Sequence, residues 1–127
     1  MPAARRALIA SSDPQNSQDL AQILTQCGLD PIASNTWHEA KHILAHKRVQ
    51  VVFCEDGLPD AGVVDILNET RLATCNVPVV VISRSGGWEE YLRAMRGGAF
   101  DVIARPCRPA EVERIVDRAL RALAVPC

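Results

Sequence analysis

Five short apolar runs alternate with five amphipathic segments along this 127-residue chain, and this alternation constrains the fold more than any other feature. The central runs are apolar at nearly every position, which is typical of strands buried on both faces of a parallel sheet. The segments between them repeat apolar side chains at the helical spacing i, i+3, i+4 and i+7. The runs predict strands at 7–10, 31–33, 51–55, 77–82 and 100–104.

Residues at the ends of the amphipathic segments predict where the helices begin and end. Asn16 or Ser17 is expected to open the first helix, and Gly28 is a suitable stop for it. Thr36, with Glu39 three residues later, has the capping-box pattern that opens a second helix. The remaining helices are expected at about 63–72, at 88–96 and from Pro109 onward.

The order of these elements predicts a single α/β domain over residues 1–127, with its core at about 5–123. Five strand–helix units favour a doubly wound, flavodoxin-like (βα)5 parallel sheet with strand order 2-1-3-4-5. In such sheets the functional site lies at the carboxyl ends of the strands. The polar residues expected there are Ser11, Ser12, Asp13, Glu55, Asp56, Ser83, Arg84 and Arg105.

Composition and charge narrow the classes of partner and location. A net charge of -1 with 48% hydrophobic residues gives no general attraction to nucleic acid or to an anionic membrane. No apolar stretch approaches the ~20 residues of a membrane span, and the start lacks the apolar region of a signal peptide, so we expect a cytoplasmic protein. The cysteines form no C-x-x-C pair and are expected to be reduced thiols rather than zinc ligands. They are Cys27, Cys54, Cys75, Cys107 and Cys127.

Four segments together resemble the receiver domains of bacterial response regulators, over about residues 5–123. They read LIASSDP (8–14), EDGLP (55–59), VPVVVIS (77–83) and GGAFDVIARP (97–106). The resemblance implies a signalling domain of a two-component phosphorelay that is not itself an enzyme. In that family an acidic pair and an aspartate hold Mg²⁺, and the aspartate accepts a phosphoryl group that a lysine and a hydroxyl contact.

The resemblance assigns family positions to individual residues of this chain. Glu55 takes the phosphoacceptor position, which the family fills with aspartate. Ser11 and Ser12 take the positions of the acidic pair. Ser83 takes the position of the switch hydroxyl, and Arg105 stands where the family has lysine.

Most of these residues depart from the chemistry of the family. Serine is neutral and a poor ligand for Mg²⁺, which favours carboxylates, so we expect no cofactor and weak or absent Mg²⁺ binding. Glutamate places its carboxylate about 1.5 Å further from the backbone, and a misplacement of about 1 Å can cost ~100-fold in rate. The planar fork of arginine is not a conservative replacement for lysine. Only Ser83 keeps the family's residue type.

These departures fit another use of the pocket. Without the acidic pair, Glu55 is expected to pair with Arg105, in bidentate geometry where the fork allows, with Ser83 hydrogen-bonded beside them. The chain is then a degenerate receiver, held in one state without phosphate and acting as a protein-interaction module. The alternative is a functional phosphoacceptor that uses Glu55 or Asp56, with Asp13 as a metal ligand.

Aromatic and basic residues crowd the second half of the chain. Exposed Trp, Tyr and Arg are enriched at interfaces, and receivers bind partners or dimerise through the fourth helix, fifth strand and fifth helix. We therefore expect a histidine kinase, an output domain or a second copy of the chain to bind there. Packing against the sheet, with solvated arginines, is the alternative. The residues concerned are Trp88, Tyr91, Arg93 and Arg96, with Val102 where many receivers place a rotating aromatic.

Two further patterns point to other ligands. His38, His42 and His46 repeat along one side of the second helix, where two histidines at i and i+4 can grip a metal. A polar face in contact with solvent is the favoured interpretation of this pattern. The hydroxyl-rich loop 11–17 lies where flavodoxin-like proteins bind the phosphate of FMN, but it contains no glycine.

Overall fold

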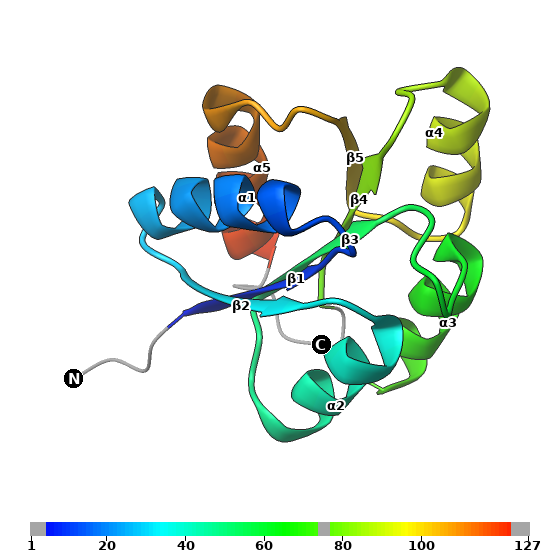
Figure 1. Cartoon of the computed structure of the whole chain (residues 1–127), viewed down its shortest axis with the longest axis horizontal. Helices are drawn as coiled ribbons and strands as arrows, with labels where there is room; N and C mark the ends of the chain where they lie inside the picture. Colours follow the sequence, from blue (N-terminus) through cyan, green and yellow to red (C-terminus); the bar gives the residue numbers. More distant parts are fainter. Residues whose placement is uncertain (1–4, 74–76, 123–127) are drawn as a thin grey trace.

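A five-stranded parallel sheet forms the centre of the protein (Figure 1). The computed structural model describes residues 5–73 and 77–122. The strand order is β2-β1-β3-β4-β5, which confirms the predicted doubly wound α/β fold. The strands are β1 (Arg6–Ala10), β2 (Asp30–Ser34), β3 (Val51–Glu55), β4 (Val79–Ser83) and β5 (Asp101–Ala104). The helices are α1 (Pro14–Gln26), α2 (Trp37–His46), α3 (Val63–Ala73), α4 (Trp88–Arg96) and α5 (Pro109–Ala122).

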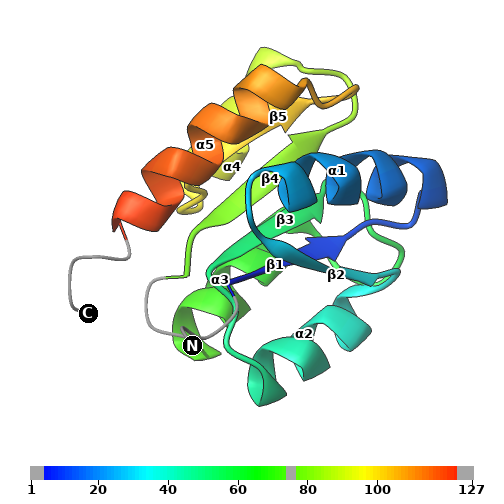
Figure 2. The same cartoon turned by 90° about the vertical axis from the view of Figure 1, so that its left-hand side faces the viewer.

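Helices cover both faces of the sheet. α1 and α5 lie on one face, and α2, α3 and α4 lie on the other (Figures 1 and 2). Because successive side chains of a strand point to opposite faces, Ile9 packs toward α1 and α5 while Leu8 packs toward the other three helices. Every residue of β3 and β4 is buried, as the apolar runs predict. None of the helices, within the described ranges, has the length and apolarity that a membrane crossing requires.

α1 begins at Pro14, before the predicted Asn16 or Ser17. Asp13 is its N-cap, because Oδ1 of Asp13 accepts hydrogen bonds from the N–H groups of Gln15 at 3.0 Å and Asn16 at 3.4 Å. Asn16 and Ser17 are buried inside the helix instead of opening it. Asp13 thus caps the helix with one oxygen and keeps its second oxygen free to contact Arg105 at the carboxyl edge of the sheet.

α2 begins as the capping pattern predicts. Oγ1 of Thr36 accepts a hydrogen bond from the N–H of Glu39 at 3.1 Å. The N–H groups of Trp37 and His38 donate to the two carboxylate oxygens of Asp60, each at 2.9 Å. These bonds lower the pKa of Asp60 and tie the loop after β3 to the start of α2.

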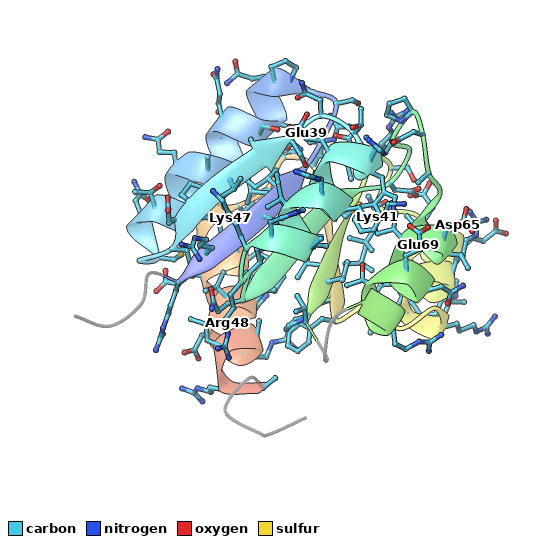
Figure 3. All side chains as sticks on the ribbon, turned by 90° about the horizontal axis from the view of Figure 1, so that it is seen from below. Glu39, Lys41, Lys47, Arg48, Asp65 and Glu69 are labelled. Carbon is cyan, nitrogen blue, oxygen red and sulfur yellow. The ribbon has the colours of Figure 1, made fainter. Side chains whose placement is uncertain are left out.

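A second contact joins α2 to α3. Trp37 is buried, and its indole Nε1–H donates a hydrogen bond to the carboxylate of Glu69. Nζ of Lys41 lies 3.7 Å from Oε1 of Glu69, and Figure 3 shows the two side chains next to each other between the helices. Together with the Asp60 cap, these bonds fix α2 against the α3 side of the sheet.

The thiols in the described ranges are free, as predicted. Cys54 is buried in β3, and burial raises its pKa to about 12. Burial also raises the pKa of Cys107, to about 11. The predicted thiols Cys75 and Cys127 and the predicted end of the core at position 123 lie outside the described residues.

Candidate functional site

The parallel register brings the predicted site residues together at the carboxyl edge of the sheet. The residues before Ser11 and Glu55 are paired between β1 and β3, so these two side chains lie next to each other. The register between β4 and β5 places Ser83 and Arg105 at the same edge. The positions that the sequence marks as a site are therefore neighbours in space.

Glu55 is a buried carboxylate with a full set of partners. Its side chain is 1% exposed. Oε2 accepts a hydrogen bond from the hydroxyl of Ser11, which is itself buried. Oε1 lies 3.1 Å from Nη2 of Arg105, 3.5 Å from Nη2 of Arg84 and 3.4 Å from Oγ of Ser12. A charge so deeply buried is stable only when it is paired and hydrogen-bonded in this way.

The predicted pair of Glu55 and Arg105 forms, but the predicted bidentate geometry is wrong. Nη2 of Arg105 meets Glu55, whereas Nη1 lies 2.9 Å from Oδ2 of Asp13. Nε of Arg105 has no hydrogen-bond partner among the described residues. The guanidinium therefore bridges two carboxylates, because the N-cap of α1 brings a second acid to the same edge.

Arg84 is a second cation next to Glu55, although the sequence analysis assigned it only a position after the fourth strand. Its Nη2 also donates a hydrogen bond to the carbonyl oxygen of Gly57 at 3.3 Å. Gly57 has a φ of +95°, and a Cβ added there would lie 3.1 Å from Cζ of Arg84. The close approach of the guanidinium to this turn depends on a residue without a side chain.

The prediction that Ser83 bonds beside the Glu55–Arg105 pair is wrong. Ser83 is buried, but its hydroxyl donates to the carboxylate of Glu90 in α4. Oγ of Ser83 accepts a hydrogen bond from the N–H of Gly86 at 2.9 Å. Glu55 has its partners already, and Glu90 offers the free acceptor. No motif in the sequence marks Glu90 beyond its place near the start of a helix.

The oxygen atoms at this edge do not match a Mg²⁺ site. Mg²⁺ favours carboxylate ligands, whereas Ser11 and Ser12 offer neutral hydroxyls. The carboxylate of Glu55 is already in contact with two guanidinium groups, which would repel a cation there. Asp13 caps α1 with one oxygen and meets a guanidinium with the other. The carboxylates of Glu55 and Asp13 are thus both engaged by protein groups.

The histidines of α2 make none of the contacts of Glu55 among the described residues. His38, His42 and His46 are all exposed, and the rings of His42 and His46 have their centroids 4.3 Å apart. Within residues 5–73 and 77–122, no three His, Cys, Asp or Glu side chains converge in a way that could hold a metal ion. The exposed placement agrees with the polar-face interpretation of the histidine pattern.

α4 presents an exposed aromatic pair. Trp88 is 70% exposed and Tyr91 is 37% exposed, and their rings stack with centroids 5.4 Å apart. Arg93 and Arg96 are exposed on the same helix. The alternative in which the aromatics pack against the sheet is therefore wrong. Val102 is half-buried and packs against the core that contains α2, α3 and α4.

A family model and two curated relatives match most of this chain. The family model for the response regulator receiver domain matches residues 7–117. The response regulator protein PilR of Pseudomonas aeruginosa is 26% identical over 92% of this chain. The regulatory protein AtoC of Escherichia coli is 27% identical over 95% of it. The chain spans 26% of the length of each of these two curated relatives.

Solved structures share the fold at low sequence identity. A response regulator receiver domain protein from Clostridium thermocellum has a TM-score of 0.87 and 19% identity, over 94% of this chain and 97% of that one. A two-component response regulator from Clostridium difficile has a TM-score of 0.87 and 21% identity, over 95% of this chain and 99% of that one. At these identities the likeness concerns the fold alone.

Proposed function

This chain belongs to the family of response regulator receiver domains, and we propose that it is a degenerate member which binds protein partners and carries out no phosphoryl chemistry. The family places the chain in two-component signalling. The proposal concerns the pocket at the carboxyl edge of the sheet. In our account this pocket holds an internal ion pair where an intact receiver holds a metal ion and accepts phosphate.

One observation carries the proposal: the carboxylate at the phosphoacceptor position is buried and fully engaged. Glu55 is 1% exposed and bonded by the hydroxyl of Ser11, with Arg105 at 3.1 Å. To act as a nucleophile it would have to leave these partners. Removing one partner from a buried ion pair costs about 3–5 kcal/mol, since the remaining charge is left without compensation. This cost opposes any approach of a phosphoryl donor to Glu55.

The residues around Glu55 also argue against the metal that phosphoryl transfer to a carboxylate requires. Charge developing on the transferred group needs a neutralising cation beside it. Ser11 and Ser12 bring no negative charge to hold Mg²⁺. The guanidinium of Arg105 already bridges Glu55 and Asp13, and Arg84 brings a second positive charge next to Glu55. An ion pair of this kind stabilises little by itself, but it fixes one arrangement of the pocket.

The alternative of a working phosphoacceptor at Glu55 or Asp56 needs Asp13 as a metal ligand. Asp13 accepts two backbone hydrogen bonds at the start of α1 and meets Arg105 at 2.9 Å. Moving it to a metal would break the cap and the ion pair together. Asp56 is half-buried at the same edge, so it is the second carboxylate that a phosphorylation test must cover.

Acetyl phosphate with MgCl₂, followed by intact-protein mass spectrometry, tests the proposal. The matched control is a rebuilt pocket with Ser11→Asp, Ser12→Asp, Glu55→Asp and Arg105→Lys, which restores the family residues. The wild-type protein should keep its mass, and the rebuilt variant should gain one phosphoryl group. Stoichiometric modification of the wild-type protein, mapped to Glu55 or Asp56, would refute the proposal.

We propose that the partner face includes the exposed pair Trp88 and Tyr91 and extends over α4, β5 and α5, for a histidine kinase, an output domain or a second copy of the chain. Support comes from the stacked aromatics and from Arg93 and Arg96, which are exposed on the same helix. Sedimentation of the wild type and of Trp88→Ala/Tyr91→Ala tests the homodimer. The exposed Gln22 of α1 provides a control, Gln22→Ala. A dimer that survives the aromatic substitutions would contradict this face.

A further inference from the structure

The hydroxyl of Ser83, at the switch position, forms a hydrogen bond with a residue of α4 and not with Glu55. Ser83 is 1% exposed at the end of β4, and its Oγ donates a hydrogen bond to Oε2 of Glu90. The same oxygen accepts the N–H of Gly86 at 2.9 Å. A hydroxyl has a single proton to donate. Ser83 therefore cannot donate to Glu55 while it is bonded to Glu90.

Glu90 uses its second oxygen on the same loop. Oγ of Ser85 donates to Oε1 of Glu90 at 2.8 Å and accepts the N–H of Gly87 at 3.2 Å. Hydrogen bonds to an ionised carboxylate are about twice as strong as neutral ones. Hydrogen bonds from Ser83 and Ser85 lower the pKa of Glu90, with a smaller contribution from the charge of Arg93, so the carboxylate is ionised at neutral pH.

The N-cap position of α4 provides no side-chain hydrogen bond to the helix. Gly87 is the N-cap of α4 and has no side chain to accept a hydrogen bond. Glu90 lies in the first turn, where a negative charge is favoured by the helix dipole. Glu89 lies in the same turn and is exposed. The two glutamates thus share the favourable charge at the helix start, but only Glu90 bonds the β4–α4 loop hydroxyls among the contacts of the described residues.

We propose that Glu90 is a positioning residue, whose carboxylate holds the hydroxyl of Ser83 away from the pocket and ties the first turn of α4 to the end of β4. This assignment rests on the proposed function, because a receiver that stays in one state without phosphate needs another group to fix its switch hydroxyl. Trp88 and Tyr91 lie in the same first turn of α4 as Glu90 and stack on each other. The contact of Glu90 with the loop thus holds the helix turn that carries this aromatic pair.

Amide hydrogen exchange on the unphosphorylated protein, measured by NMR without Mg²⁺ or acetyl phosphate, tests the assignment. Glu90→Ala should raise exchange at Gly86 and in the first turn of α4 about tenfold, since bonds to a charged group are lost. The matched control Glu89→Ala, which removes the same charge from the same turn, should change these rates less than about twofold. Ser83→Ala should raise exchange at Gly86 in the same direction. At Gly86 the double variant Ser83→Ala/Glu90→Ala should then exchange no faster than Ser83→Ala alone, because Glu90 acts on this N–H only through the hydroxyl of Ser83.

A second measurement keeps the assignment falsifiable if Glu90→Ala fails to fold. In Glu89→Gln protein labelled with fluorotryptophan, the Trp88 resonance should still move as the pH falls below the ordinary glutamate pKa of about 4.3. Adding Glu90→Gln should abolish that movement. Equal effects of the Glu89 and Glu90 substitutions, or additive effects of Ser83→Ala and Glu90→Ala, would overturn the assignment and leave the proposed function standing. Phosphorylation of the wild type would refute the proposed function without altering these exchange results.

Discussion

Replacing Arg105 with glutamine removes the main counter-charge of a buried carboxylate. Breaking one side of a buried ion pair costs about 3–5 kcal/mol. Arg84 remains at 3.5 Å from Glu55, but its side chain is 59% exposed and solvent screens much of its charge, so it replaces Arg105 only in part. The lost contact with Asp13 is also half-exposed and adds at most about 1 kcal/mol. Arg105→Gln should therefore lower the free energy of unfolding by about 2–4 kcal/mol.

Urea denaturation at neutral pH, followed by circular dichroism, measures this loss. Arg108→Gln is the matched control, because Arg108 is an exposed arginine of the same loop, and it should cost less than about 0.5 kcal/mol. The double variant Glu55→Gln/Arg105→Gln should be more stable than Arg105→Gln, since it leaves no buried charge without a partner. A loss below about 0.5 kcal/mol for Arg105→Gln, or a double variant less stable than the single one, would refute the reasoning.

Three further outcomes follow from the geometry. Gly57→Ala should lower the free energy of unfolding, measured by urea denaturation, by about 1–2 kcal/mol, because a side chain is strained at a φ of +95° and would crowd Arg84. The control Gly62→Ala should lower it less, because a Cβ at that position would meet nothing closer than 3.8 Å. Cys54 should resist iodoacetamide at about pH 8 in the native state and react in urea, because burial raises its pKa to about 12; rapid native labelling of its peptide would contradict this. The pKa of Asp60 is lowered in the fold, so its contribution to stability is present above the unfolded pKa of about 3.9 and is lost as the pH falls through the folded value. The free energy of unfolding of Asp60→Asn should therefore fall less steeply toward acid pH than that of the wild type. An unchanged pH dependence would contradict the role of Asp60 as a cap of α2.

The sheet and the meeting of Glu55 with Arg105 could be predicted from the sequence because both depend on strand positions. Apolar runs locate the strands, and in a parallel sheet their carboxyl ends converge on one edge. Residues that directly follow the runs, such as Ser11 and Glu55, are then neighbours whatever their side chains do. The family positions added an expected role for each residue at this edge, but no geometry within the pocket.

The partners chosen by individual side chains could not be predicted in the same way. Arg105 contacts two acids because α1 begins two or three residues earlier than predicted, with Asp13 as its N-cap. Ser83 turns to Glu90 because the loop after β4 brings a helix carboxylate within reach of a hydroxyl with one proton to give. Arg84 reaches Glu55 over the turn at Gly57. Each of these contacts is set by the path of a loop, which has no hydrophobic period to read.

A crystal structure of the protein grown with Mg²⁺ and beryllofluoride tests the central claim most directly. Beryllofluoride binds the acceptor carboxylate of an intact receiver as a phosphoryl mimic. Our account predicts that Nη2 of Arg105 stays in contact with Oε1 of Glu55 and that neither the metal nor the mimic binds at this edge. A magnesium ion coordinated by Glu55, with Arg105 turned out into solvent, would contradict it.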